Sequence, residues 1–577
     1  MNIRINMANN MASDPLISFY LQRYQTYIDT ALHELSEQQI IERIWEHDFT
    51  VWGSSPDEIS NRLGWLHSIE DMQSKLPEIE TFVEAVHNDG YTSVLLLGMG
   101  GSSLAPELFS NTFPNGKISL QVHVLDSTDP GAVLSYSKSL DPLKTLFIVS
   151  TKSGGTEETL SFFKFFYNLL VERIGYADTG NHFVAITDPE SKLVALAKKH
   201  GFRHIFINDP NVGGRFSALT YFGLVPAALS GVDISVLLSR AKKMAAQCSP
   251  TVTILENPAA ILGVTLGELA KHGRDKATFI LSPQISSFGN WVEQLIAEST
   301  GKQGKGILPV IGEDPIRPDA YEKDRLFIYI QLENDRGAET ARQSVLQRAG
   351  HPVLRIQVDD IFDLGGQFFL WELATAIAGW RLQINPFDQP NVELAKIRAR
   401  DMVKVYQTEK SLPRQHLVLA DERAEIYGAI SAISPAEAIS RLVSSVRPGD
   451  YIAIQAYVQP TIVTDIALRK LQSVLTSKTR LATTIGYGPR FLHSTGQLHK
   501  GDGGNGIFLQ ITTHSPTDVP IPDQAGEPAS SITFGVLILA QALGDQEALL
   551  NQGRRVLRVH IKENVPDTIL TLAEELN

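Results

Sequence analysis

Two stretches of the chain join glycines and hydroxyl side chains at the end of an apolar run. The first is VSTKSGGTEETL, residues 149–160. Its hydroxyl and glycine residues are Thr151, Ser153, Thr156, Gly154 and Gly155. Apolar residues precede the stretch and an amphipathic run follows it, so it should join a strand to a helix. A helix N-terminus offers unpaired N–H groups and the positive end of its dipole, which suits a phosphate. The alternative is plain helix capping by Thr156 with Glu158 or Thr159.

The second stretch is LLLGMGGSSL, residues 95–104, which again runs from strand through glycine turn and hydroxyls into a helix. Gly98, Gly100 and the later Asp126 also fit part of a dinucleotide-binding fingerprint, which keeps a nicotinamide dehydrogenase open as an alternative. Ser103 stands where the third glycine of that fingerprint belongs, and the GKS/T triplet of a Walker loop is absent. Two hydroxyl-rich loops favour a monophosphate over a pyrophosphate as the ligand.

The surrounding pattern predicts an α/β fold with parallel sheets flanked by helices. Apolar runs such as TSVLLLG, TLFIVS and HFVAITD alternate with helical patterns, and they are too apolar for a sheet with one wet face. We predict a helical N-terminal lead-in at 1–90, α/β domains at 91–230 and 231–405, and an α/β C-terminal region at 406–577. The polar segment 407–425, which contains Pro413, is predicted to be a linker.

Composition narrows the classes of protein. The chain has 577 residues and a formal net charge of -13, which disfavours nucleic acid and anionic membranes as partners. Its single cysteine, Cys248, excludes an internal disulfide and a multi-cysteine zinc site. There is no apolar run of transmembrane length and no secretory h-region in the first residues. We therefore expect a soluble, cytoplasmic protein.

Five blocks, in this order, resemble the phosphoglucose isomerase (glucose-6-phosphate isomerase) family. They are LGMGGSSLAPE, STKSGGTEET, VGGRFSALTYFG, VEQLIAESTGK and INPFDQPNVELAK, and they lie between residues 95 and 396. The lead-in RIWEHDFTVWG and the late YGPRFLHSTGQLHKG look most like the isomerase portion of bifunctional transaldolase/phosphoglucose isomerases. The resemblance implies two sugar isomerase (SIS) domains and the interconversion of glucose 6-phosphate and fructose 6-phosphate, a step of glycolysis and gluconeogenesis. It implies no cofactor and no metal, and a homodimer.

The resemblance also assigns roles to residues. Glu298 matches the base that moves a proton between C1 and C2, and Arg215 matches the arginine that stabilises the enediolate. Lys396 matches a residue that contacts the ring oxygen. The substrate- and phosphate-binding positions implied are Gly101, Ser102, Thr151, Lys152 (through its backbone), Ser153, Thr156, Gly214, Gln294 and Gln389. The commonest family form has an aromatic residue and a threonine where this chain has Gly154 and Gly155.

The histidine that opens the sugar ring is the main departure from the family pattern. The family carries it in a Gly-Gln-His-Ala block, supplied by a neighbouring subunit, and no such block lies between Lys302 and Asn385. We expect His493, in the late glycine-rich stretch, to take this role, with His499 as the second choice. The C-terminal region would then belong to the active site.

Two further alternatives stay open. A phosphosugar-binding regulator would keep the phosphate loops but lose the base and the arginine, and this chain retains Glu298 and Arg215. A dual phosphoglucose/phosphomannose isomerase would differ by a hydroxyl that holds a water, and Thr300 keeps that option open. A metal-dependent isomerase is disfavoured because it would need a cluster of His and Glu side chains at ligand spacing.

Overall fold

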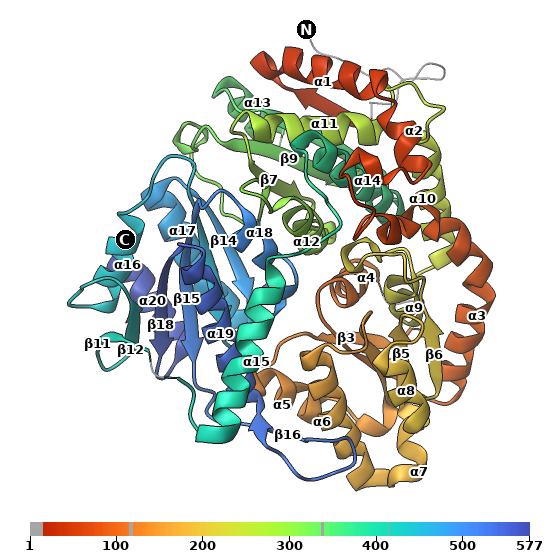
Figure 1. Ribbon diagram of the computed structural model, residues 1–577, viewed down its shortest axis with the longest axis vertical. Coiled ribbons are helices and arrows are strands. Elements are labelled where there is room, and N and C mark those ends of the chain that lie inside the picture. Colours follow the sequence, from red (N-terminus) through yellow and green to blue (C-terminus); the bar gives the residue numbers. More distant parts are fainter. Residues whose placement is uncertain (1–15, 115–118, 336–339, 414) are drawn as a thin grey trace.

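The computed structural model describes residues 16–114, 119–335, 340–413 and 415–577. Three sheets, each flanked by helices, form three units that meet near the middle of the molecule (Figure 1). The α/β fold with parallel sheets is confirmed. No helix of the described residues is long and apolar enough to cross a membrane.

The first sheet is wholly parallel, with strands in the order β3-β2-β4-β5-β6. The strands are β2 (Ser93–Gly98), β3 (Gln121–Leu125), β4 (Thr145–Ser150), β5 (Phe183–Thr187) and β6 (His204–Ile207). Val94 and Leu96 of β2 face one hydrophobic core, while Leu95 and Leu97 face a second core that contains Phe163 of α6 (Glu157–Ile174). Since both faces are buried, the strands read as continuous apolar runs.

The second sheet has the order β1-β10-β9-β7-β8, and only β1 runs antiparallel to its neighbour. Its strands are β1 (Ile17–Tyr20), β7 (Lys276–Leu281), β8 (Leu308–Ile311), β9 (Arg325–Leu332) and β10 (Val353–Val358). The nearby helices α10 (Ile234–Gln247), α11 (Pro258–Lys271) and α12 (Phe288–Thr300) all pack against α14 (Leu364–Leu382). β1 lies in the segment expected to be helical, and it forms by pairing with β10 far along the chain.

The third sheet belongs to the C-terminal region and has the order β11-β12-β18-β15-β13-β14. Its strands are β11 (Leu417–Ala420), β12 (Ala424–Gly428), β13 (Tyr451–Tyr457), β14 (Ala482–Tyr487), β15 (Gly506–Thr513) and β18 (Arg555–Ile561). The expected linker at 407–425 was therefore partly wrong, because β11 and the start of β12 form an antiparallel hairpin on β18. Arg414 of that segment lies outside the described residues.

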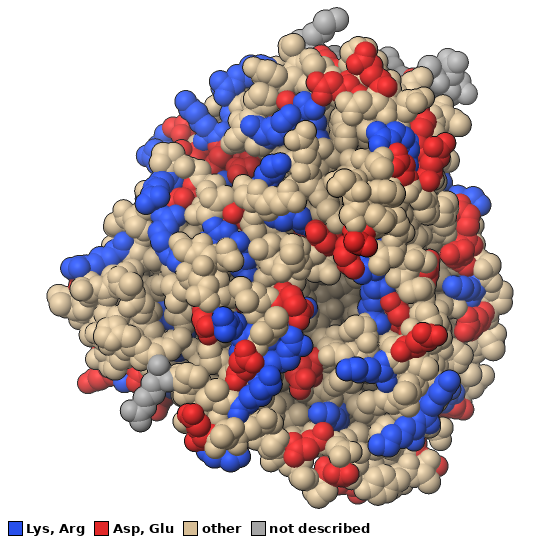
Figure 2. Space-filling view, in the orientation of Figure 1, with Lys and Arg blue, Asp and Glu red and all other residues tan. Residues whose placement is uncertain are grey.

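The C-terminal unit is tied to the other two. Helix α15 (Val392–Glu409) packs along α19 (Phe534–Asn551) and runs between the C-terminal and first units in Figure 1. The loop between β16 (Pro520–Ile521) and β17 (Ile532–Thr533) reaches α6, where the Gly526 N–H donates to Asn168 Oδ1 at 2.6 Å. Figure 2 shows that this face of the molecule is hollowed near its centre, with acidic and basic side chains around the hollow.

Candidate functional site

The loop 151–156 lies at the carboxyl end of β4 and leads into α6. Thr156 occupies the N-cap position of α6, but its side chain makes no capping bond to the helix backbone. Its hydroxyl lies 2.8 Å from the Thr151 hydroxyl instead. Gly154 has a φ of +67°, and a Cβ there would lie 2.5 Å from the backbone nitrogen of Leu193. The plain capping alternative is thus not the observed geometry, and the unusual Gly154 is required by a close backbone contact.

The second glycine loop brings the first unit against both of the others. Gly100 has a φ of +55°, and a Cβ on it would lie 2.8 Å from the carbonyl oxygen of His493 and 3.0 Å from Gln294 Nε2. A Cβ on Gly101 would lie 2.0 Å from the carbonyl oxygen of Gly214. A Cβ on Gly214 itself would meet no atom within 4 Å. Gly100 and Gly101 are therefore the residues that allow these loops to approach one another closely.

A buried arginine and glutamate pair lies beside these glycines. Glu298, in the last turn of α12, accepts at Oε1 from Arg215 Nη1 at 3.1 Å, and the two side chains are only 11% and 3% exposed. Its other oxygen accepts from Gln294 Nε2, one helical turn earlier, at 3.0 Å. Gln294 Nε2 also donates to the carbonyl oxygen of His493 at 2.8 Å. The carboxylate is thus held at both oxygens, and Gln294 connects it to the histidine segment.

Arg215 is fixed by a second set of contacts. Its Nε donates to Ser299 Oγ at 2.7 Å, its Nη1 to Gln389 Oε1 at 3.1 Å, and its Nη2 to the carbonyl oxygens of Pro386 and Asp388. Lys302 Nζ reaches the same segment, 2.7 Å from Asp388 Oδ1, and burial lowers the pKa of Lys302 to about 8. Gln389, expected on the phosphate side, contacts the arginine in this structure.

His493 lies next to a buried carboxylate from the other side of the site. Its Nε2 is 3.0 Å from Glu158 Oε1, which also accepts from Gln541 Nε2 at 2.7 Å. Burial raises the pKa of Glu158, but the nearby His493 and Lys396 outweigh it, so that the pKa lies below its usual value. Ser153, Thr156 and Lys396 line a cavity of about 390 Å³ together with Glu158 and His493.

The structure separates two other predicted residues from this cluster. His499 is buried against the rings of Phe508 and Phe491, and burial holds its pKa well below the usual value. The Thr300 hydroxyl is fully buried, donates to the carbonyl oxygen of Ile296 at 2.7 Å and accepts from the N–H of Ile307 at 2.9 Å. Both of its hydrogen-bonding functions therefore serve the backbone around α12.

The Lys152 side chain points away from the cluster. Its ammonium pairs with Asp188 and donates to the carbonyl oxygen of Pro210 at 2.8 Å. Only its backbone is left for a ligand, as the resemblance implied. Ser102 is half-buried in the turn Gly100–Ser102, which packs against the turn Gly214–Phe216 that carries Arg215.

Sequence reasoning missed an ion-pair cluster behind the histidine. Arg490, three residues before His493, pairs with Glu107 and lies 2.8 Å from Asp126 Oδ2. Asp126 Oδ2 also accepts from the Ser103 hydroxyl at 3.2 Å. Asp126 and Ser103 are the two residues weighed for a dinucleotide fingerprint, and here they link the glycine loop to the histidine segment. Asp126 is engaged in that link, which argues against the dehydrogenase alternative.

The carboxyl group of Glu293, near this cluster, has a raised pKa. Glu293, next to Gln294 on α12, lines a cavity of about 320 Å³ with Glu107 and Arg490. Burial raises the pKa of Glu293 to about 8, although the charge of Arg490 opposes the shift. Within the described residues no group of three or more His, Cys, Asp or Glu side chains could hold a metal ion.

Loops at the carboxyl ends of parallel strands, a buried Arg–Glu pair and a polar cavity define an α/β protein built to bind a small ligand. Residues 67–306 match the family model described as phosphoglucose isomerase. A glucose-6-phosphate isomerase of Thermus thermophilus is 30% identical over 387 residues, which cover 59% of this chain and 90% of the relative. One from Carboxydothermus hydrogenoformans is 29% identical over 391 residues, 58% of this chain and 83% of the relative. The chain belongs to the phosphoglucose isomerase family.

Solved structures agree at the level of the fold. A hypothetical protein of Thermus thermophilus superposes with a TM-score of 0.57 at 27% identity, covering 67% of this chain and 99% of that chain. A glucose-6-phosphate isomerase of Chlamydia trachomatis gives a TM-score of 0.57 at 17% identity, with coverage of 69% and 89%. Nearly the whole of the first neighbour thus matches only part of this chain.

Proposed function

We propose that this chain interconverts glucose 6-phosphate and fructose 6-phosphate by moving a proton between C1 and C2. The observation that carries the proposal is the Glu298 carboxylate, buried and held by Arg215 at 3.1 Å and Gln294 at 3.0 Å. A proton next to a carbonyl group is removed only by a positioned base, while the oxyanion that develops needs a donor. Glu298 and Arg215 supply these two functions side by side. Membership of the family supports the same reaction.

The phosphate of the substrate is proposed to bind at the start of α6. The hydroxyls of Thr151, Ser153 and Thr156 lie there, and the Thr156 side chain leaves the first N–H groups of the helix without a side-chain cap. Such groups, together with the dipole, stabilise a phosphate. Gly101 and Ser102 would close this subsite from the neighbouring loop.

The proposed reaction uses four side chains. His493, with Lys396, donates a proton to the ring oxygen and opens the sugar. Glu298 removes the C2 proton and Arg215 stabilises the cis-enediolate, after which Glu298 returns the proton to C1. Glu158 accepts a hydrogen bond from His493 and so holds the imidazole in place for ring opening. No metal enters these steps.

One chain is proposed to hold the complete site. The first and second sheet units would be the two SIS domains, and the C-terminal unit would supply His493 to the same chain's Glu158 and Gln294. A homodimer, expected from the resemblance, is then not needed to complete the site. The likeness to the isomerase portion of bifunctional transaldolase/phosphoglucose isomerases rests on the sequence blocks alone.

The test is a coupled assay that follows glucose 6-phosphate formed from fructose 6-phosphate after treatment with EDTA. Wild type should turn over, and Glu298→Gln should lose activity by roughly 10²–10⁴-fold, as expected for a general base. Calorimetry with fructose 6-phosphate on both proteins shows whether the variant still binds. Binding of fructose 6-phosphate by a wild-type protein without turnover would favour the regulator instead.

A further inference from the structure

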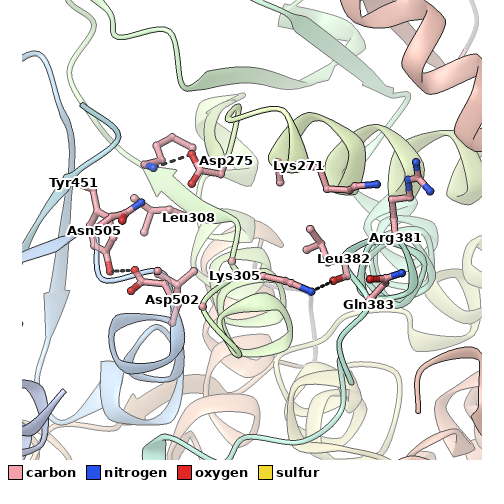
Figure 3. Close-up of a pocket in the computed structure, with 16 residues that line it drawn as sticks. Lys271, Asp275, Lys305, Leu308, Arg381, Leu382, Gln383, Tyr451, Asp502 and Asn505 are labelled. Carbon is pink, nitrogen blue, oxygen red and sulfur yellow. Dashed lines mark hydrogen bonds and ion pairs between the residues drawn. The ribbon is translucent and has the colours of Figure 1, made fainter. Parts of the chain in front are cut away.

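A third cavity, of about 450 Å³, lies between the second sheet unit and the C-terminal unit. Figure 3 shows Tyr451, Asn505 and Asp502 on its C-terminal side and Lys271 and Arg381 on the opposite side, with Lys305 between them. None of the residues that line this cavity lines the one that contains His493. It is therefore a separate site.

The basic residues that line this cavity, Lys271, Lys276, Lys305 and Arg381, outnumber its two acidic residues, Asp275 and Asp502. Each acidic lining residue already has a cation, since Asp275 lies 2.7 Å from Lys276 and Asp502 lies 2.9 Å from Arg554. Arg381 is neutralised from behind by Glu34 and Glu268. Two lysines remain: Lys305 has no ion pair among the described residues, and Lys271 has only a weak one.

The first of these, Lys305, donates through Nζ to the carbonyl oxygen of Leu382 at 2.7 Å. Across the described ranges 16–114, 119–335, 340–413 and 415–577, no carboxylate pairs with it. The second, Lys271, lies 3.6 Å from Glu268, a carboxylate that Arg381 already engages, and its side chain is 42% exposed. Both lysines can thus turn toward an anion at little cost in lost ion pairs.

We propose that this cavity binds a small metabolite that carries a phosphate or polyphosphate group. Lys305 and Lys271 would hold the anionic group, while the amides of Gln383 and Asn505 would hydrogen-bond the rest of the ligand. The volume falls in the range of small-molecule sites, about 300–1,000 Å³. The ligand goes beyond the proposed isomerase substrate, because this cavity shares no lining residue with the one that contains His493.

The cavity is coupled to the candidate active site through two segments. Residues 301–306 directly follow α12, which carries Glu298; within them Lys302 contacts Asp388 near Arg215, and Lys305 reaches the cavity. Leu498 of α18 (Gly496–Gly501), which begins shortly after His493, lines the cavity and lies against Gly301, where a Cβ would be 2.2 Å from the Leu498 Cα. A ligand that fixes both segments should therefore stabilise the docked units and alter turnover.

The test is isothermal titration of inorganic phosphate into the full chain. Wild type should show two sites, one at the phosphate loop and one in this cavity. Lys305→Gln should weaken one of them by about tenfold or more, the usual effect of losing a charge-assisted hydrogen bond. Lys305→Arg should retain both sites, and Lys470→Gln, at an exposed lysine of α17 (Ile462–Thr479), is the matched control.

A Ser153→Ala/Thr156→Val double variant separates this proposal from the isomerase. It should lose the loop site and keep the one that depends on Lys305. A single wild-type site that vanishes in the double variant, or equal binding by wild type and Lys305→Gln, would overturn the proposal. Both results come from binding measurements alone, so they do not depend on whether the isomerase assignment is correct. Circular dichroism checks that each variant is folded.

Discussion

The contact between Glu158 and His493 gives the sharpest prediction about the site. Glu158 is 6% exposed, and its Oε1 lies 3.0 Å from His493 Nε2 and 2.7 Å from Gln541 Nε2. In Glu158→Gln the side chain keeps its size and loses its charge. The variant therefore removes the charge-assisted hydrogen bond to the histidine while leaving the packing nearly intact.

The size of the effect follows from that single bond. A hydrogen bond to a charged group contributes about 1.5–3 kcal/mol, which corresponds to roughly a 10- to 150-fold fall in kcat. KM for fructose 6-phosphate should stay the same or fall, because the lost negative charge lies at the start of α6, where the phosphate is proposed to bind. The coupled assay across a substrate series gives both constants.

The matched control is Glu157→Gln, which removes the same charge one residue earlier. Glu157 is exposed and lines the same cavity, but it has no contact with His493 among the described residues. Its kcat should stay within about threefold of wild type. Equal losses in the two variants, or a fall of less than about threefold in Glu158→Gln, would refute a positioning role for Glu158.

The same contact predicts a pH dependence of stability. The pKa of Glu158 is lowered in the folded protein, so the stability that its charge contributes is full above the unfolded carboxyl pKa, about 4.3. That contribution is lost as the pH falls through the lower, folded pKa. The Tm difference between wild type and Glu158→Gln should therefore shrink on acidification, and a difference that grows below pH 4 would contradict the sign.

Three further predictions concern the surroundings of the histidine. Gly100→Ala should lower the free energy of unfolding by about 1–3 kcal/mol and reduce kcat, as measured by urea unfolding and the coupled assay. Gly213→Ala is the control and should do neither, because the nearest atom to a Cβ there would be 3.6 Å away. Glu293 has a pKa raised to about 8, so the stability of the protein should fall as the pH rises from about 4.5 to 8. Glu293→Gln should flatten this fall in Tm measurements. Equal slopes of Tm against pH in wild type and Glu293→Gln would refute the prediction. Arg490→Gln should lower kcat by loosening the histidine segment, and an unchanged kcat would exclude a role for the Arg490–Asp126 ion pair in holding it. The double variant Arg490→Gln/Asp126→Asn should recover part of the lost Tm, because it removes one unpaired carboxylate.

Local sequence was sufficient for most elements of the sheets. The runs TSVLLLG, TLFIVS and HFVAITD, predicted as strands, became β2, β4 and β5, because strands buried on both faces need continuous apolar residues. The edge strands were harder. β1 and β11 have four residues each and β11 has no buried residue, so neither run is long enough to identify a strand without its partner. β1 depends on pairing with β10, far along the chain, and β11 on the hairpin that it forms with β12.

The candidate site was readable only where its residues are neighbours in the chain. The loops with Thr151 and Gly100 showed their glycines and hydroxyls directly, whereas Arg490 and Gln541 reach the site through the fold of the C-terminal unit. Glu158 gave a local signal, an acidic residue two positions after Thr156 at the start of α6, but the same pattern also fits a helix cap. Only the position of His493 in the structure distinguishes a site residue from a helix cap.

If one chain holds the complete isomerase site, mixing two inactive variants should not restore activity. Glu298→Gln lacks the proposed base and His493→Asn lacks the proposed acid. The two are refolded together from denaturant, so that any shared assembly contains both chains, and the coupled assay is run on the mixture. With the whole site in one chain, the mixture should show no more activity than the sum of the separate variants. A clear gain on mixing would show that the histidine acts in the site of a neighbouring chain and would contradict the account.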